Sequence, residues 1–138
     1  SRRSTPPSTQ WILTYAAIRG TTPREMRVFK VLRVEEWAEL CASGTSAGAA
    51  IDRVDGYVHF STAAQLTETL ARHFAGEGSL ILLSRESEAA PAMTWEPSRG
   101  GALFPHLYAP MKLSDLTDLG EIGWDGSGHN LPEGWNDV

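Results

Sequence analysis

Ionisable and hydroxyl side chains are concentrated in one short segment, DGYVHFSTAAQ, which spans residues 55–65. Tyr57, His59 and Ser61 occupy every second position of this segment. Side chains alternate between the two faces of a strand, so these three polar groups would share one face while the apolar residues between them face a core. Such a row of hydrogen-bonding groups is suited to holding a polar ligand.

A helix is predicted to begin directly after this strand. Thr62 and Gln65 have the spacing of a capping box, in which each side chain pairs with the backbone N–H of the other residue. An apolar stripe with helical spacing follows, formed by Leu66, Leu70 and Phe74. The first turn of a helix carries unpaired N–H groups and a partial positive charge. His59 and Ser61 precede that turn, which predicts a site for a phosphate or a ribose hydroxyl.

A second group of polar side chains lies in the segment TWEPSRGGALFPHLY. Glu96 belongs to a short predicted strand, and Arg99 lies in the glycine-rich loop that follows. Phe104, His106 and Tyr108 alternate along the next predicted strand, where they form either half of a core or the wall of a ligand pocket. Sites are usually built at strand ends and loops, so the two segments predict a common cleft.

The predicted cleft is built around His59, Glu96 and His106, and each of these residues also has a structural explanation. A strand histidine can simply donate to a backbone carbonyl in the core, and a glutamate can be solvated or ion-paired. Two histidines and a carboxylate could also hold zinc with an open position. The sequence contains no closely spaced HxH or HExxH pattern, so no metal is expected.

The elements that would position these residues predict an α+β fold. Strands are predicted for VFKVLR, SLILLS, MTWE and HLYAPMKL, with DLTDLGEI as a last strand or a turn of helix. SLILLS is a continuous apolar run, which is typical of a central strand buried on both faces. VEEWAELCASG predicts a short helix with Trp37, Leu40 and Cys41 on its apolar side, and TSAGAAIDRVDG predicts a loop. Several short strands with two helices in the first half favour the α+β class.

The chain has 138 residues, enough for one domain with a substantial core. Residues 1–25 are largely polar and contain prolines, so we expect a partly flexible extension there and a single α+β domain over residues 26–138 with a loop-like C-terminal tail. The single cysteine excludes an internal disulfide and fits a reducing compartment. No apolar run reaches membrane-spanning length, so the expected location is the cytoplasm.

The formal net charge of −5 argues against a broad basic face for nucleic acid. An anionic ligand would have to be held locally, by a few arginines, backbone amides or a helix end. The expected partner is therefore a small-molecule or nucleotide-like ligand, without membrane association.

Several segments, taken in order, resemble a bacterial family catalogued as domain of unknown function 952: VFKVLRVEEW, DGYVHFSTAAQ, ARHF, LILL, TWEPSRGGALFPHLY and DGSGHNLPE. The resemblance covers about residues 26–133. Ala109 departs from the family pattern, which usually has glycine after the tyrosine. The family is grouped with the ADP-ribosyltransferase-like folds, which implies two small packed, mainly antiparallel sheets with a cleft for NAD.

The resemblance also implies roles for individual residues. In such enzymes a strand-borne histidine contacts a ribose of NAD, an aromatic ring stacks on nicotinamide, and a late acidic residue stabilises an oxocarbenium-like transition state. His59 matches the histidine, Glu96 is the implied acidic residue, and His106 is the alternative occupant of that late position. The implied NAD-binding residues are Tyr57, Ser61, Thr62, Arg72, Arg99, Phe104 and Tyr108. Either arginine could neutralise the pyrophosphate through bidentate hydrogen bonds.

We therefore expect an NAD-binding, ADP-ribosyltransferase-like protein that acts on an unknown acceptor, as an ADP-ribosyltransferase or an RNA 2′-phosphotransferase-like enzyme. One alternative is a non-catalytic nucleotide or small-molecule binding module of the same fold. Another is a pathway-recruited protein with an unknown ligand. The first two interpretations differ in whether Glu96 matters for catalysis.

Overall fold

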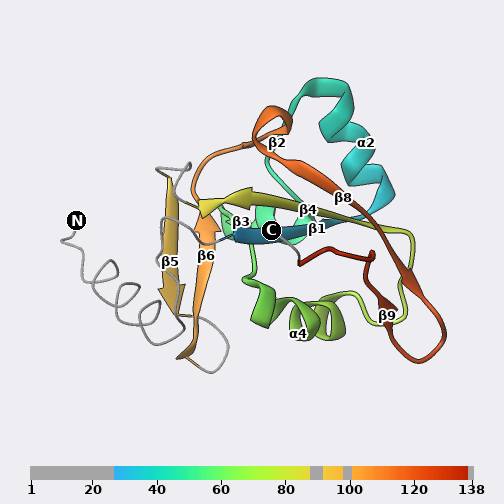
Figure 1. Ribbon diagram of the computed structural model, residues 1–138. Coiled ribbons are helices and arrows are strands. Elements are labelled where there is room, and N and C mark those ends of the chain that lie inside the picture. Colours follow the sequence, from blue (N-terminus) through green and yellow to red (C-terminus); the bar gives the residue numbers. More distant parts are fainter. Residues whose placement is uncertain (1–26, 88–91, 98–100, 137–138) are drawn as a thin grey trace.

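The computed structural model of the chain describes residues 27–87, 92–97 and 101–136 (Figure 1). The expected N-terminal extension and Arg99 lie outside these residues. The helices are α2 (Val34–Ser43), α3 (Ala50–Asp55) and α4 (Ala63–His73). The strands are β1 (Arg27–Leu32), β2 (Thr45–Ser46), β3 (Val58–His59), β4 (Leu80–Glu86), β5 (Met93–Pro97), β6 (Leu103–Leu107), β7 (Met111–Lys112), β8 (Thr117–Trp124) and β9 (His129–Asn130).

The strands form antiparallel sheets, which confirms the α+β class. A four-stranded sheet has the order β1-β4-β8-β9, and a three-stranded sheet has the order β3-β6-β5. Strands β2 and β7 form a further short pair. No helix in the described part of the chain is both long and apolar enough to cross a membrane.

Strand β4 is the central long strand, and its apolar run is buried on both faces as predicted. Leu80 and Leu82 pack into one hydrophobic cluster with α4, whereas Leu83 packs into a second cluster with Leu40 of α2. Figure 1 accordingly shows α2 and α4 on opposite sides of β1 and β4. Side chains alternate along a strand, so a continuous apolar sequence is required where both faces are covered.

The segment that contains the predicted histidine joins the two main sheets. Strand β3 pairs with β6, which places His59 opposite His106. Two residues later, Ser61 forms two backbone hydrogen bonds with Phe29 of β1. The chain between residues 58 and 61 therefore pairs with one sheet at its start and with the other at its end, and His59 lies at the seam between them.

Three local predictions were wrong. The predicted loop after α2 contains helix α3, because the carboxylate of Asp52 accepts from the N–H of Ala49 at the helix start and Gly56 ends the helix in a left-handed conformation. Cys41 is exposed rather than packed in the core, since α2 turns Leu40 inward instead. The predicted strand HLYAPMKL is two strands, β6 and β7, separated by a turn that contains Pro110.

The predictions for helix α4 were confirmed, and the segment DLTDLGEI, predicted as a last strand or a turn of helix, contributes to one of each. The hydroxyl of Thr62 accepts from the N–H of Gln65, whose side chain accepts from the N–H of Thr62 in return. The predicted apolar stripe of helix α4, formed by Leu66, Leu70 and Phe74, is buried. Within DLTDLGEI, residues 117–122 belong to strand β8, whereas Asp115 is the last residue of a short 3-10 helix, Leu113–Asp115.

Candidate functional site

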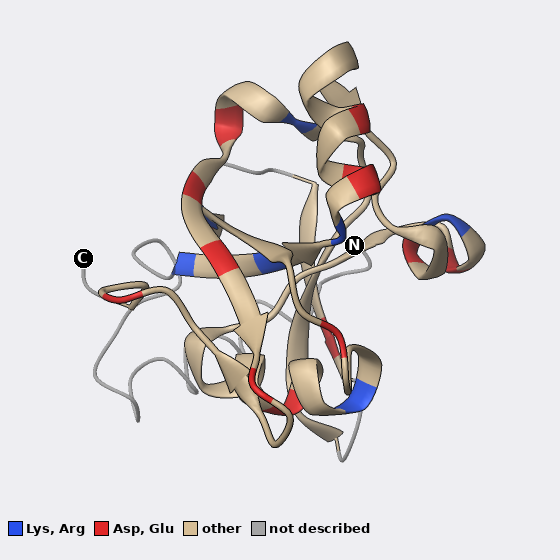
Figure 2. Ribbon diagram, turned by 90° about the vertical axis from the view of Figure 1, so that its right-hand side faces the viewer, with Lys and Arg blue, Asp and Glu red and all other residues tan. Residues whose placement is uncertain are grey.

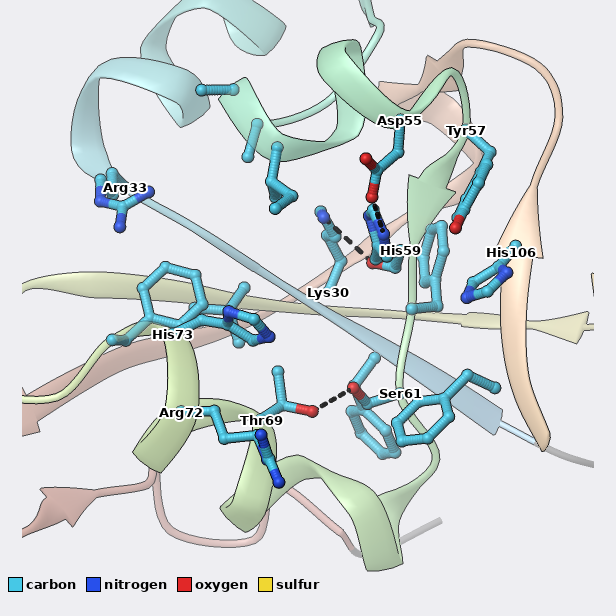
Figure 3. Close-up of a pocket in the computed structure, with 18 residues that line it drawn as sticks. Lys30, Arg33, Asp55, Tyr57, His59, Ser61, Thr69, Arg72, His73 and His106 are labelled. Carbon is cyan, nitrogen blue, oxygen red and sulfur yellow. Dashed lines mark hydrogen bonds and ion pairs between the residues drawn. The ribbon is translucent and has the colours of Figure 1, made fainter. Parts of the chain in front are cut away.

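A pocket of about 590 Å³ opens at the seam between the two sheets (Figure 3). It is lined by residues from β1, α3, β3, α4 and β6. The residues that were predicted from the sequence and that line this pocket are Tyr57, His59, Ser61, Arg72, Phe104 and His106. Thr62, Glu96 and Tyr108 are not among its lining residues, although they lie close to residues that are.

Both ring nitrogens of His59 face carboxylate oxygens. Nδ1 lies 2.6 Å from Oδ1 of Asp52, and Nε2 lies 3.0 Å from Oδ2 of Asp55. Helix α3 supplies both carboxylates, three residues apart, just before the turn into β3. When protonated, the ring donates to both acidic residues, so His59 is held in one orientation from two sides.

Asp52 is the centre of a buried charged network. Its carboxylate has no exposed surface and lies 2.6 Å from Nζ of Lys30, which also donates to the carbonyl oxygen of His59. Backbone N–H groups of Ala49 and His59 donate to the same carboxylate. Burial by itself would raise the pKa of Asp52, but the hydrogen bond from His59 and the charge of Lys30 outweigh it and lower the pKa to about 2.

Lys30, Asp52 and Asp55 were not among the residues predicted from the sequence, although the sequence contained one signal for them. Lys30 interrupts the apolar strand VFKVLR, and a buried lysine requires a carboxylate partner. The structure adds a second constraint at Gly48, whose φ is +99° and where a Cβ would collide with the carboxylate of Asp52. The predicted loop assignment concealed both acidic residues, since a loop gives no reason for them to face β3.

His106 has a different arrangement. Its Nδ1 lies 2.7 Å from Oε1 of Glu96, and the hydroxyl of Tyr108 donates to the same oxygen over 2.8 Å. The imidazole is buried, with 4% of its side chain exposed, whereas 35% of the Glu96 side chain is exposed. Burial lowers the pKa of His106, and the hydrogen bond and charge of Glu96 oppose this shift without cancelling it. Burial, helped by the hydrogen bond to Glu96, raises the pKa of Tyr108 to about 12.

Tyr57 connects the two histidines. Its ring centroid lies 4.7 Å from that of His59 and 4.3 Å from that of His106, and the two imidazole centroids are 5.3 Å apart. Figure 3 shows the three rings grouped on one side of the pocket. The three rings therefore contact one another pairwise.

The hydroxyl groups of the strand–helix turn already have partners within the protein. Ser61 lies in the pocket wall, with its Oγ 2.8 Å from Oγ1 of Thr69. Thr62 caps α4, and Gln65 donates to the carbonyl oxygen of Leu103 in β6. This turn therefore fastens α4 to the three-stranded sheet and presents Ser61, rather than Thr62, to the pocket.

More cationic than anionic side chains line the pocket, although each cation is paired with a carboxylate outside the lining: Asp52 for Lys30, Glu77 for Arg33 and Glu68 for Arg72. Lys30, Arg33 and Arg72 line it, and Asp55 is the single carboxylate among its described lining residues. Figure 2 shows lysines and arginines dispersed over separate elements of the described chain. The guanidinium of Arg72 pairs with Glu68 at 3.2 Å, and both side chains are more than half exposed. Exposed pairs of this kind contribute about 0–1 kcal/mol, so Arg72 can exchange its partner for a ligand anion at little cost.

The sequence matches the family model described as protein of unknown function (DUF952) over residues 31–119. The chain belongs to the DUF952 family. The matched range contains both strand histidines and their carboxylate partners, and it begins one residue after Lys30.

The chain is also similar to solved structures of another protein. The DUF952 chain is 38% identical to protein CC0527 from Caulobacter crescentus in its X-ray crystal structure, with a TM-score of 0.71, over 78% of this chain and 94% of that one. The solution NMR structure of CC0527 gives 37% identity and a TM-score of 0.65, over 81% and 96% of the two chains. A search of the curated proteins finds no match.

The chemistry available to this DUF952 chain follows from the side chains described above. Within residues 27–87, 92–97 and 101–136, no group of three or more histidine, cysteine or acidic side chains could hold a metal ion. The pocket instead offers hydrogen-bonding groups, aromatic faces and a basic rim. This combination suits a ligand with hydroxyl groups, a planar ring and negative charge.

Proposed function

We propose that this protein binds NAD in the pocket at the sheet seam and belongs functionally with the ADP-ribosyltransferase-like enzymes. The observation that carries the proposal is the placement of His59 and Ser61, from one strand–helix motif, in the wall of a single pocket. The pocket volume of about 590 Å³ lies within the range of small-molecule sites, roughly 300–1,000 Å³.

The lining residues suit the separate parts of the dinucleotide. The His59–Asp55 pair can exchange hydrogen bonds with ribose hydroxyls, and Tyr57 or Phe104 offers an aromatic face to nicotinamide. Arg72 can bind the pyrophosphate bidentately. When bound, NAD supplies an ADP-ribosyl group that is bonded to a positively charged nicotinamide ring, and this ring becomes neutral as it leaves. A carboxylate near the sugar stabilises the positive charge that develops as that bond breaks.

A second candidate is a binding module that recognises NAD or ADP-ribose without turnover. The position of Glu96 favours it, because this carboxylate pairs with His106 and Tyr108 and does not line the pocket. Asp55 is the carboxylate that does line the pocket, and it is already paired with His59.

Calorimetric titration of NAD and ADP-ribose separates these proposals when nicotinamide release is assayed on the same samples. We expect wild-type protein to bind, His59→Ala to lose binding, and His129→Asn to keep it, because His129 lies outside the pocket and contacts the carbonyl oxygen of Phe74. Binding with release supports an enzyme, and binding without release supports the module. Absence of binding to folded wild-type protein would refute the NAD proposal.

A further inference from the structure

His106 is a pocket residue with one occupied ring nitrogen and one available ring nitrogen. Nδ1 is hydrogen-bonded to Glu96, and no described residue donates to or accepts from Nε2. His106 lines the pocket and Glu96 does not. Because Nδ1 is taken by Glu96, which does not line the pocket, Nε2 is the ring nitrogen left for a ligand.

The hydrogen-bond donors around Glu96 determine which nitrogen of His106 carries the proton. A carboxylate can only accept hydrogen bonds. The hydroxyl of Tyr108 donates to Oε1 of Glu96, and Nδ1 of His106 must donate to the same oxygen. A neutral imidazole has only one N–H group, so Nε2 is left with a lone pair directed at the pocket. A carboxylate that fixes a histidine in this tautomer is the arrangement by which proteins orient a general base.

The surroundings of His106 favour the neutral ring. The titratable groups that face it are Glu96 from β5, Tyr108 from the following turn, Tyr57 and His59 from the β3 segment, and Asp55 from α3. Burial and the neighbouring His59 lower the pKa of His106 against the opposing effect of the two carboxylates. His59 offers no equivalent lone pair, because both of its nitrogens face acidic oxygens.

We propose that His106 is a general base that accepts the proton of a hydroxyl-bearing acceptor, either an alcohol or water, through Nε2. The inference rests on the proposed function. In the proposed reaction, the acceptor oxygen gives its proton to Nε2 of His106 and bonds to the ribose carbon that carries nicotinamide. The bond from that carbon to nicotinamide breaks, and the ring nitrogen of nicotinamide keeps the electron pair and becomes neutral. His106 then releases the proton to solvent.

The first test needs no ligand and measures which ring nitrogen of His106 carries a proton. Long-range proton–nitrogen NMR spectra at pH 8 identify His106 by the signals that disappear in His106→Gln. We expect a protonated Nδ1 and an unprotonated Nε2. Glu96→Gln keeps the imidazole, and we expect it to lower the pKa of His106 further and to mix the tautomers, because an amide can donate as well as accept. A proton on Nε2, or a charged ring at pH 8, would overturn the proposal.

The second test measures nicotinamide release from NAD, in water and with added methanol as the alcohol probe. We expect release to rise with pH through the pKa of His106 and to fall by about 100-fold or more in His106→Gln, with NAD saturating in both proteins so that release is compared between bound states. Equal release by wild type and His106→Gln overturns the inference and leaves the NAD proposal standing. If wild-type protein binds no NAD, the proposed function fails, and the tautomer measurement alone decides whether Nε2 is a base.

Discussion

The two histidine–carboxylate pairs of the pocket lie on neighbouring strands but have opposite environments. His59 is the more exposed ring, and its partner Asp52 has no exposed surface. His106 is the buried ring, and its partner Glu96 is about one-third exposed. Both nitrogens of His59 face carboxylates, whereas one nitrogen of His106 is left for the pocket. Similar residue types therefore produce one fixed, fully paired ring and one ring with an available lone pair.

The difference shows that burial of the acidic residue, rather than burial of the imidazole, decides whether a histidine–carboxylate pair mainly stabilises the fold or mainly controls the proton of the histidine. A buried carboxylate must be satisfied from every side, so Asp52 gathers Lys30, His59 and two backbone N–H groups into a rigid network. Glu96 is partly solvated, so its loss costs the fold less, and its main effect is on the proton of His106. Four predictions test this comparison.

The largest effect is expected from removing the buried acid. Asp52→Ala leaves Lys30 buried without its charged partner, and removal of one member of a buried pair typically costs about 3–5 kcal/mol of unfolding free energy. Glu96→Ala is the matched control, and we expect it to cost about 1 kcal/mol because water can replace a partly exposed carboxylate. Urea denaturation of the two variants measures both values. Equal losses would show that burial does not distinguish the pairs.

Low pH should destabilise the buried charged network around Asp52, because it protonates the carboxylate. Folding lowers the pKa of Asp52 from 3.8 to about 2. Its stabilising contribution, on the order of 2 kcal/mol, is therefore complete above about pH 4 and is lost as pH falls toward 2. We expect the unfolding free energy of wild-type protein to fall more steeply across this window than that of Asp52→Asn. Parallel curves for the two proteins would contradict a charged Asp52.

Protonation of His106 should change the unfolding free energy in a separate and higher pH range than protonation of Asp52. Because folding lowers the pKa of this histidine from its usual 6.5, the folded state binds fewer protons than the unfolded chain, and stability is complete above about pH 6.5. Stability then decreases as pH falls through the folded pKa. Urea titrations between pH 8 and pH 5 should show a smaller slope for His106→Asn than for wild type, and equal slopes for the two proteins would contradict the prediction.

The smallest effect is expected for Tyr108→Phe. The hydroxyl donates to Glu96 from a half-exposed side chain, so its loss should cost about 0.5–1 kcal/mol. The His106–Glu96 hydrogen bond remains, and we expect the Nδ1-protonated tautomer of His106 to persist. NMR spectra that show a changed tautomer in this variant would mean that Tyr108, and not Glu96, orients the ring.

Local patterns were sufficient for several parts of the site. Alternation along YVHFS placed His59 and Ser61 on the face opposite Val58 and Phe60, and the Thr62 capping box marked the start of α4. These predictions succeeded because side-chain alternation and capping depend on residues that are adjacent in the sequence. Helix α3 was missed because its small residues give no apolar period. The carboxylate of Asp52, which accepts from the N–H of the N-cap residue Ala49, is held by Lys30 of β1, which is distant in the sequence.

The amino-acid sequence by itself determined the family, the antiparallel α+β class, the central buried strand and the strand–helix turn that carries His59. Only the tertiary structure decided the partners of each histidine. Pairing of β3 with β6 set the two rings opposite one another, and α3 brought Asp52 and Asp55 to His59. The register of β5 with β6 placed Glu96 within hydrogen-bonding distance of His106, and Glu96 does not line the pocket. Such contacts depend on strand register and helix packing between distant segments, which local residue patterns do not encode.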